Sequence, residues 1–515
     1  MSNKISENNK RIAKNTLLLY IRMLLTMVIT LYTSRVIIST LGVIDFGIYN
    51  VIGGVITALS FFTAAMAGAT QRFLSYAIGQ NDVMALKDIF AGCLKLHLLI
   101  ALLFVLLSET VGLWFINTML VIPQEKIYAA NWIYQFTIIS FIITIICVPY
   151  NATIIAHEKM SAFAYISILE VTLKLLIAYL LVYVNYDKLI IYGLLLTLVT
   201  ILLQVVYSIY CAKHFIEARF SIRCTNEVIK KIGKYIGWSL YSNLSGIVYG
   251  QGINFLLNIF FGPTVNAARA IAYQVQGAVQ RFITSFQMAV NPQIVKLYAQ
   301  KDFVAMYKLM IQSSRLSFYL MFIMTLPIYV YINEILTIWL KDVPTYTGIF
   351  CRLILIISLV DTVSNPLTTA TQATGQLKLN ALLGGTNLLL IIPTSILFLK
   401  MGYSPQSVFY INIIFSLTGL IIRLYINKRL ISFPIKDFIY NVFLKNWCIA
   451  LIASILPFTL SYIFKHDIYT IIYVSITSLI SSVLIIYLIG LERNEKKFIN
   501  KNIQVAISKL IKRNV

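Results

Sequence analysis

Fourteen apolar stretches, each about as long as a membrane-crossing helix, follow one another along the 515-residue chain. A helix needs about 20 mostly apolar residues to cross the hydrocarbon core of a bilayer. Hydrophobic residues make up 59% of the chain, whereas a soluble domain is roughly 45 to 50% apolar. The pattern excludes an ordinary soluble enzyme and predicts an all-α polytopic membrane protein. The stretches are 16–40, 46–70, 89–110, 127–148, 162–184, 189–211, 236–260, 269–292, 312–333, 346–369, 379–399, 403–422, 446–464 and 468–491.

The excess of positive charge, 42 Lys and Arg against 19 Asp and Glu, carries topological information. With the N-terminus inside, 29 of these cations fall in cytoplasmic segments and only five in external loops. Cytoplasmic loops of membrane proteins are enriched in Lys and Arg. We therefore expect both termini in the cytoplasm and no nucleic-acid partner. The eight cations within stretches are Arg22, Arg35, Lys95, Lys174, Arg269, Arg281, Arg315 and Arg352.

An internal repeat relates stretches one to six to stretches seven to twelve. Sliding 41–100 onto 261–320 without a gap pairs Gly42 with Gly262, and the polar segment 80–82 with 300–302. A second segment, 149–174, pairs with 366–391. Because six is even, the copies share one orientation and should be related by a pseudo-two-fold axis along the membrane normal. The prediction is two six-helix lobes, 1–211 and 236–430, a cytoplasmic linker, 212–235, and a C-terminal part, 431–515, with two extra helices and a basic cytoplasmic tail.

The opening of the chain carries a family resemblance. Three features of this opening resemble polysaccharide-repeat-unit flippases of the Wzx type. They are Arg35, the segment 41–49 with Leu41-Gly42 and Phe46-Gly47-Ile48-Tyr49, and a glycine-rich second stretch reaching Gln71-Arg72-Phe73. These belong to the multidrug/oligosaccharidyl-lipid/polysaccharide (MOP) exporter superfamily. The resemblance implies alternating access and translocation of an undecaprenyl-pyrophosphate-linked oligosaccharide, the repeat unit of O-antigen lipopolysaccharide, capsule or exopolysaccharide, across the bacterial cytoplasmic (inner) membrane. It implies as partners this substrate, membrane lipids and the polysaccharide polymerase machinery.

Polar residues of the eighth stretch share one helix face. At about 100° per residue, they fall within roughly 60° of one another. Amides are costly in hydrocarbon, so this face must meet protein or water. Asn and Gln both donate and accept hydrogen bonds, which suits sugar hydroxyls. We expect a cavity wall, and the alternative is hydrogen bonding between helices. The face consists of Arg269, Tyr273, Gln276, Gln280, Gln287 and Asn291.

Arginines and amides of other stretches extend the predicted cavity. Arg22 shares a face with threonines in the first stretch, and Asn243 and Asn254 share one in the seventh. Arg281 lies near the midplane of the eighth stretch, away from the glutamines. Guanidinium groups bind phosphate oxygens in bidentate fashion. We therefore predict that Arg22, Arg269 and Arg281 attract the pyrophosphate. Related lipid flippases use cavity arginines on their first, second and eighth helices, and this chain has no basic residue in the second before Arg72.

Two carboxylates lie deep in the stretches, Glu170 and Asp361. Glu170 precedes Lys174 by four residues, which favours an intrahelical ion pair, although intramembrane carboxylates also bind driving ions in transporters. Asp361 has no cation three or four residues away. We name Asp361, Glu170 and Lys174 as candidates for ion coupling.

Two other readings stay open. A multidrug/cation antiporter of the same superfamily is less favoured, because a cationic drug requires acids. A membrane-embedded polysaccharide polymerase or ligase requires a sizeable external loop, and the longest, 111–126, has one acid and one Lys. The sequence contains no metal-ligand spacing of histidines, no P-loop and no nucleophile elbow. We expect a transporter without cofactor or metal rather than an enzyme.

Overall fold

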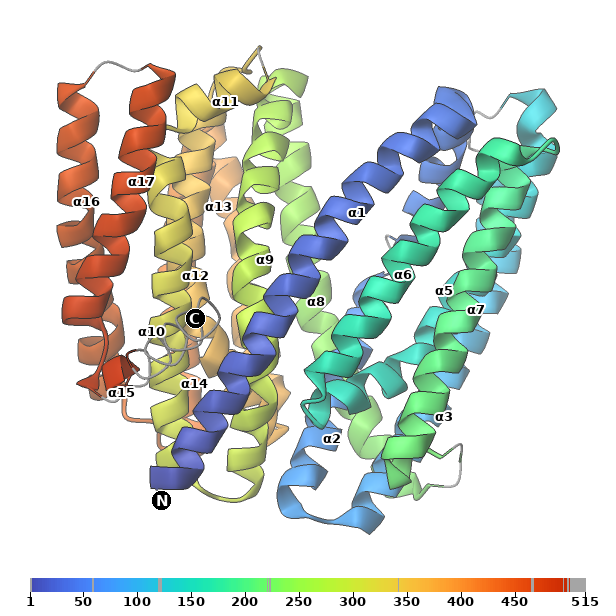
Figure 1. Cartoon of the computed structure of the whole chain (residues 1–515), viewed down its shortest axis with the longest axis horizontal. Coiled ribbons are helices and arrows are strands. Elements are labelled where there is room, and N and C mark those ends of the chain that lie inside the picture. The colour runs from blue at the N-terminus through green and yellow to red at the C-terminus, as the bar shows by residue number, and fades with distance from the viewer. Residues whose placement is uncertain are drawn as a thin grey trace, which may run out of the picture. The chain divides into compact units, whose positions relative to one another are not determined.

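The computed structural model describes residues 2–57, 60–118, 123–219, 221, 224–340, 342–464, 467–493, 495–497 and 500, and these form helices and short connections without a strand. The all-α fold is confirmed. The predicted basic tail, 501–515, lies outside the described residues. In chain order the helices are α1 (Ser2–Thr57), α2 (Ser60–Gln80), α3 (Val83–Leu107), α4 (Leu113–Thr118), α5 (Ile127–Ala156), α6 (Met160–Leu180), α7 (Lys188–His214), α8 (Asn226–Phe261), α9 (Pro263–Ala299), α10 (Phe303–Val330), α11 (Ile332–Leu340), α12 (Thr347–Thr374), α13 (Leu377–Lys400), α14 (Ser407–Ile431), α15 (Ile435–Phe438), α16 (Lys445–Ile463) and α17 (Ile468–Ile485) (Figure 1).

Twelve helical segments of the described residues are long and apolar enough to cross a membrane, and they coincide with all predicted stretches except the second and the eighth. The eighth lies on α9, whose 37 residues are long enough to span a bilayer but whose amides lower its hydropathy. The second, 46–70, runs from the end of α1 into α2 across residues 58–59, which lie outside the described part. The chain is therefore a multi-pass membrane protein.

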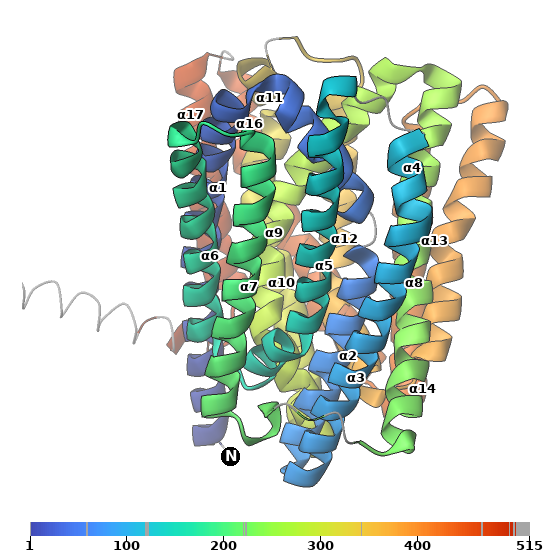
Figure 2. The same cartoon turned by 90° about the vertical axis from the view of Figure 1, so that its right-hand side faces the viewer.

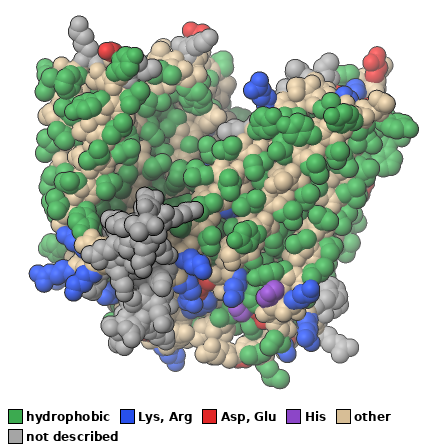
Figure 3. All heavy atoms as spheres, viewed as in Figure 1, with side chains coloured by type: hydrophobic (Ala, Val, Ile, Leu, Met, Phe, Trp, Pro, Cys, Tyr) green, Lys and Arg blue, Asp and Glu red, His purple; other side chains and the backbone are tan. Residues whose placement is uncertain are grey.

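Apolar side chains cover the sides of the helices, as expected for contact with lipid. Figure 3 shows hydrophobic side chains over the visible face, and in the unit that contains the N-terminus the Lys and Arg side chains gather mainly at the end of the helices where Figure 1 marks that terminus. This is the end that the sequence predicts to be cytoplasmic. The clustering of charge agrees with the bias of cations between loops.

Backbone conformations confirm the internal repeat. Gly42 has a φ angle of 79° and its repeat partner Gly262 has 78°. Asn81 and Lys301, paired by the same alignment, have φ angles of 56° and 57°. Left-handed φ values are uncommon outside glycine, so their recurrence at matched positions marks the same turn in both copies.

Helix caps agree with the same alignment. Asp82 accepts a hydrogen bond from the backbone N–H three residues on, at 2.9 Å, and begins α3. Asp302 does the same at 3.1 Å before α10. In the second aligned segment, Glu158 after α5 and Gly375 after α12 both have positive φ, 60° and 77°. The two copies thus share helix ends as well as helix order.

Contacts between helices divide the chain into two compact units. The first unit comprises Met1–Val248, Thr284–Met306 and Thr368–Thr386, and the second comprises Tyr249–Ile283, Tyr307–Leu367 and Asn387–Val515. The first unit therefore contains the first repeat together with one end of each of α8, α9, α10, α12 and α13. Residues 226–235 of the predicted linker belong to α8. The predicted lobe boundaries stay a prediction.

Within the first unit, α5, α6 and α7 lie side by side in both views (Figure 1, Figure 2). α7 approaches α5 so closely at Gly193 that a Cβ there would lie 2.5 Å from the Cδ1 of Ile133. The Thr197 hydroxyl one turn later donates to the backbone carbonyl of Phe136 on α5 at 3.0 Å. A glycine and a threonine thus fix this helix pair.

Within the second unit, Arg315 on α10 anchors the segment that follows α17. Its side chain is buried, and its two terminal nitrogens donate to Glu492 Oε1 at 2.8 Å and Glu495 Oε1 at 2.6 Å. Gln312 adds a bond to Glu495 at 3.0 Å. Arg315 is one of the eight cations that the sequence places within a stretch, and the structure shows it packed inside the unit and paired with two acids. The two glutamates tie the end of the last helical hairpin to the core of the unit.

Replacing Arg315 by Ala is expected to lower the free energy of unfolding by about 3 kcal/mol, because breaking a buried pair leaves its partner charge uncompensated. Glu495, whose side chain is 10% exposed, accounts for most of this loss, since Glu492 is 48% exposed and can be hydrated. The loss can be measured by SDS titration followed by circular dichroism. Lys308→Ala removes an exposed cation from the same helix and should leave the midpoint unchanged. Equal midpoints for the two variants would contradict the anchoring role.

Candidate functional site

Arg269, at the start of the predicted polar face of α9, is bonded to α8. Its Nη2 donates to the carbonyl of Gly250 at 2.8 Å and its Nη1 to Asn254 Oδ1 at 3.3 Å. The guanidinium lies over the ring of Tyr273, 4.5 Å from its centroid. The structure therefore brings together Arg269 and Asn254, two residues predicted for the cavity.

Two amides of the same face bond to α12. Gln276 Nε2 donates to the Ser358 hydroxyl at 2.9 Å, and Asn291 Oδ1 accepts from the Thr369 hydroxyl at 3.1 Å. Interhelical hydrogen bonding, the alternative to a cavity wall, is therefore confirmed at these two positions. The role of the other polar residues of this face stays a prediction. In α9, Gln280 is half-buried and Arg281 exposed in the second unit, and Gln287 is buried in the first.

Asp361 is an exposed carboxylate in the most buried of the candidate spans. Its neighbours Val360 and Thr362 are 3% and 1% exposed, whereas its own side chain is open. The hydroxyl of Ser416 on α14 donates to Asp361 Oδ1. Arg423, also on α14, is the cation whose charge acts on this carboxylate. An acid with a hydroxyl donor and a cation beside it has the groups needed to exchange a proton or a small cation.

Arg423 corrects the sequence analysis. The predicted twelfth stretch ended at residue 422, which placed this arginine among the loop cations, but α14 continues to Ile431. Its Nη1 donates to the Ser364 hydroxyl on α12 at 3.0 Å. Arg423 follows Ser416 by seven residues, so both share one face of the helix. The spacing of seven residues could have placed Arg423 on the polar face of this helix, but the predicted end of the stretch at residue 422 left Arg423 outside it.

Tyrosines link Asp361's surroundings to Arg269. Tyr249 on α8 forms a side-chain hydrogen bond with Tyr273 and interacts electrostatically with both Arg269 and Asp361. Asn412 on α14 donates to the Tyr249 hydroxyl at 2.6 Å. We call this set the second-unit polar cluster; it contains two cations and one acid. Its members are Tyr249, Asn254, Arg269, Tyr273, Asp361, Ser364, Asn412, Ser416 and Arg423.

In the first unit, Arg22 on α1 bonds to α6. Its Nη1 lies 3.4 Å from the Ser167 hydroxyl, and the guanidinium lies over the Phe163 ring at 4.6 Å. Its Nε is buried without a hydrogen-bond partner among the described residues. Glu170 acts on Arg22 through its charge, and its carboxylate bonds to Lys174 at 2.6 Å. The predicted Glu170–Lys174 ion pair is confirmed.

Asn243, the remaining predicted residue, bonds within its own helix. Its Nδ2 donates to the Ser239 carbonyl one turn earlier, at 2.9 Å. Among the described residues, no group of three or more His, Cys, Asp and Glu side chains is placed to hold a metal ion.

Arg72 closes the end of α12 within the first unit. Its Nε donates to the carbonyl of Gln372 at 3.0 Å and its Nη2 to that of Ala373 at 2.6 Å. The side chain is 6% exposed and lies over the rings of Phe73 and Tyr76. A cation at the carboxyl end of a helix is favoured by the helix dipole. Arg72 belongs to the segment that carries the family resemblance, but the sequence assigned it no contact.

A second residue that the sequence analysis missed is Glu158, in the turn between α5 and α6. Its carboxylate accepts from Arg11 Nε at 2.9 Å and Gln293 Nε2 at 2.5 Å, and it forms an ion pair with Lys296. Its backbone carbonyl accepts from Asn15 Nδ2 at 3.2 Å. Glu158 is 5% exposed. It joins α1, the α5–α6 turn and the end of α9.

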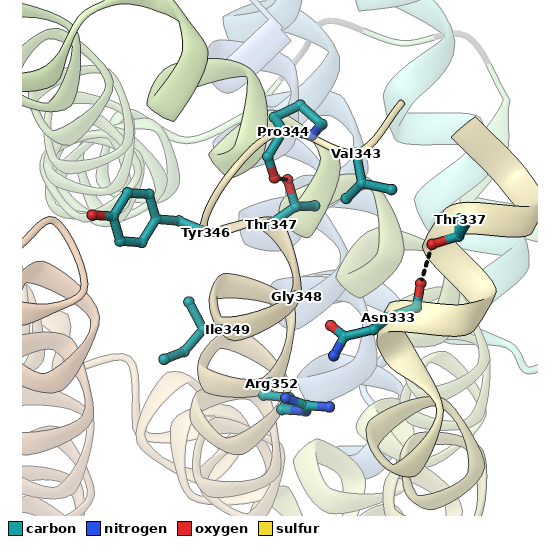
Figure 4. Close-up of a pocket in the computed structure, with 9 residues that line it drawn as sticks. All are labelled: Asn333, Thr337, Val343, Pro344, Tyr346, Thr347, Gly348, Ile349 and Arg352. Carbon is teal, nitrogen blue, oxygen red and sulfur yellow. Dashed lines mark hydrogen bonds between the residues drawn. The ribbon is translucent and has the colours of Figure 1, made fainter. Parts of the chain in front are cut away.

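A cavity of about 480 Å³ opens in the second unit between α11 and the start of α12 (Figure 4). Arg352 lies at its edge, with its Nε donating to the Tyr329 carbonyl at 3.3 Å. None of the residues predicted to bind substrate lines it. The lining residues are Asn333, Thr337, Val343, Pro344, Tyr346, Thr347, Gly348, Ile349 and Arg352.

Comparison with known proteins identifies the fold. No protein-family model and no curated protein matches the chain. Among solved structures, a MATE transporter in the straight conformation is 13% identical, with a TM-score of 0.72 over 83% of this chain and 97% of its own. An outward-facing multidrug resistance MATE family transporter of the MOP superfamily gives 13% and 0.70, over 83% and 96%. A MOP superfamily transporter from Pyrococcus furiosus gives 13% and 0.68, over 83% and 96%. The chain therefore has the two-lobed fold of the MATE transporters of the MOP superfamily.

Proposed function

We propose that the protein is a flippase that moves an undecaprenyl-pyrophosphate-linked oligosaccharide from the cytoplasmic to the outer leaflet of the inner membrane by alternating access. The supporting observation is the bonding of its intramembrane arginines. Arg22 and Arg269 bond to a hydroxyl, an amide and a carbonyl rather than to carboxylates. Among the described residues neither guanidinium forms an ion pair, so each could bind a pyrophosphate, whose oxygens suit guanidinium groups.

In this proposal, Arg22, Arg269 and Arg281 attract the pyrophosphate. The amides contact sugar hydroxyls, and the polyprenyl tail stays in the surrounding lipid. Asp361 is the first candidate for ion coupling, because its carboxylate is open, whereas Glu170 is engaged by Lys174. The amides are Gln276, Gln280, Gln287, Asn243 and Asn254. In this proposal Gln276 and Asn254 exchange their hydrogen bonds to Ser358 and Arg269 for bonds to the sugar.

A multidrug/cation antiporter is the second candidate, and the fold supports it equally. A structural neighbour is a multidrug resistance MATE family transporter, and Asp361 provides one acid for a cationic drug. The second-unit polar cluster contains two cations and one acid, and this excess of positive charge disfavours the binding of a cationic drug. For the Pyrococcus furiosus neighbour, a reversed polarity of the binding pocket was taken to suggest a different function. Polarity, rather than fold, therefore separates the two candidates.

Deleting the protein is expected to leave the undecaprenyl-linked repeat unit on the cytoplasmic leaflet. In proteoliposomes loaded with a defined lipid-linked oligosaccharide, Arg22→Ala and Arg281→Ala should each slow translocation by about tenfold, since a bond to a charged group is worth about 1.5 to 3 kcal/mol. Arg35→Ala removes an exposed arginine of α1 and should have no effect. Unchanged rates in both variants would reject the arginine site. Translocation of a cationic dye without translocation of the oligosaccharide would favour the antiporter.

A further inference from the structure

Repeat-equivalent residues meet at the end of the first unit where the N-terminus lies. Gly79 on α2 and Ala299 on α9 occupy the same position in the two copies. A Cβ at Gly79 would lie 2.8 Å from the Cβ of Ala299 and 2.9 Å from the Cα of Lys296. The two helix ends are therefore in direct contact.

Two further contacts at this end are also related by the repeat. Arg72 on α2 binds the last turn of α12, and Gln293 and Lys296 on α9 bind Glu158 in the turn after α5. α2 corresponds to α9, and α5 corresponds to α12. The contact of α2 with the end of α12 is thus the repeat counterpart of the contact of α9 with the end of α5.

The two contacts differ in what is bound. Arg72 binds main-chain carbonyls, which cannot leave without unwinding α12. Glu158 presents a side-chain carboxylate, which can leave by rotating its own bonds. Its three donors are Arg11, Gln293 and Lys296. Only this second contact can exchange one anion for another.

The three donors together are suited to phosphate. Two are cationic, and they surround a single carboxylate, so the cluster is positive overall. Lys and Arg with an amide donor form the charge-assisted bonds that phosphate oxygens accept. The Arg11 side chain is 50% exposed and that of Lys296 14%. Arg11 and the edge of Lys296 can therefore be reached from the water at the end that the sequence predicts to be cytoplasmic, where a lipid-linked precursor begins, whereas Gln293 is 3% exposed and lies behind them.

We propose that Arg11, Gln293 and Lys296 form a loading site for the pyrophosphate headgroup, and that Glu158 is a built-in anion which occupies this site until a headgroup displaces it. Displacement releases the α5–α6 turn from α9, so that binding of substrate favours opening of this end. This inference rests on the proposed flippase function. It names residues beyond the arginines predicted within the spans.

The test is titration of the full-length protein, in nanodiscs of neutral lipid, with inorganic pyrophosphate. Glu158→Gln removes the competing charge and should bind at least about fivefold more tightly than wild type, in the usual range of coupling between sites. Lys296→Gln and Arg11→Gln should bind more weakly than wild type, and Lys296→Arg should bind as wild type does. Glu217→Gln is the matched control, because Glu217 is another buried acid of this unit, bonded to His157 rather than to the donors. Glu158→Gln binding no more tightly than Glu217→Gln would overturn the proposal.

A cross-linking measurement reports the opening. Tyr76 on α2 and Tyr298 on α9, whose ring centroids are 6.2 Å apart, lie beside the contact between Gly79 and Ala299. They can be replaced by a cysteine pair in a background without the native cysteines. Pyrophosphate should lower the yield of a short cross-linker in this background, and should not do so when Lys296→Gln is added. A purely structural role of Glu158 predicts no response to pyrophosphate, and that result would also overturn the proposal.

Phosphate oxygens also occur on ordinary anionic lipids, so two further titrations separate the sources. Undecaprenyl pyrophosphate should block pyrophosphate binding at a lower mole fraction than phosphatidylglycerol does. Equal competition by the two lipids would overturn the assignment to substrate. If the variants follow the expected order while no oligosaccharide is translocated, the flippase function fails and the anion site stands. If translocation is intact but Glu158→Gln matches Glu217→Gln, only the loading site fails.

Discussion

Replacing Arg72 by Ala is expected to lower the free energy of unfolding by about 3 kcal/mol, because leaving a buried acceptor without its donor costs about 1 to 3 kcal/mol. Two such acceptors, the carbonyls of Gln372 and Ala373, would lose their donor at once. The stacking of the guanidinium on Phe73 and Tyr76 would be lost as well. SDS titration followed by circular dichroism measures the change.

Local measurements and a conservative variant separate this role from a general loss of charge. Hydrogen exchange should speed up at the last turn of α12 before it does elsewhere in the helix. Arg72→Lys keeps the charge at the helix end but offers a single nitrogen, so it should fall between wild type and Arg72→Ala. If Arg72→Lys is as unstable as Arg72→Ala, the helix-end charge has no role. If Arg72→Ala unfolds at the wild-type midpoint, the capping contact is unimportant.

Asp361→Asn is expected to reduce gradient-driven translocation to the level of protein-free liposomes. The substitution keeps an acceptor for Ser416 but removes the charge that faces Arg423. A group that cannot change its protonation or bind a cation cannot couple an ion gradient to movement. Flux should be measured under an imposed proton gradient and, separately, under a sodium gradient.

Two matched variants define the specificity of the effect. Asp342→Asn makes the same chemical change at an exposed position between α11 and α12 and should leave flux unchanged. Glu170→Gln should retain most of the flux, because that carboxylate already bonds to Lys174. Pyrophosphate binding by Asp361→Asn should stay normal, since the arginines are intact. Persistent gradient-driven flux in Asp361→Asn would reject Asp361 as the coupling residue.

Much of the architecture could be predicted because its signals are local. Hydropathy over about 20 residues located the twelve helical segments that are apolar enough to cross a membrane among the described residues. The eighth stretch lies on a helix, α9, that is not one of these twelve. The repeat was recoverable since its turn residues, such as Asn81 and Lys301, recur in register and adopt the same conformation. The Glu170–Lys174 pair followed from a spacing of four residues in one helix.

The polar contacts were less predictable because their partners are distant in the chain. Arg72 binds a carbonyl 300 residues away, and Glu158 binds Gln293 across 135 residues. The sequence placed Arg315 within a stretch, but its partners Glu492 and Glu495 could not be named from the sequence. Periodicity shows which face of a helix is polar but not which helix it meets.

The sequence by itself therefore determined the class of this protein: a chain of membrane helices in two similar copies, with its cations biased to one side. These properties follow from the free energy of placing each segment in lipid or water, which depends on the segment alone. The tertiary structure decided which charges are already balanced. It showed that Glu170 and Arg315 have partners, that the charge of Arg423 acts on Asp361, and that Glu158 occupies a set of anion donors. Charge pairing acts over a few ångströms, and only folding brings residues from distant helices to that distance.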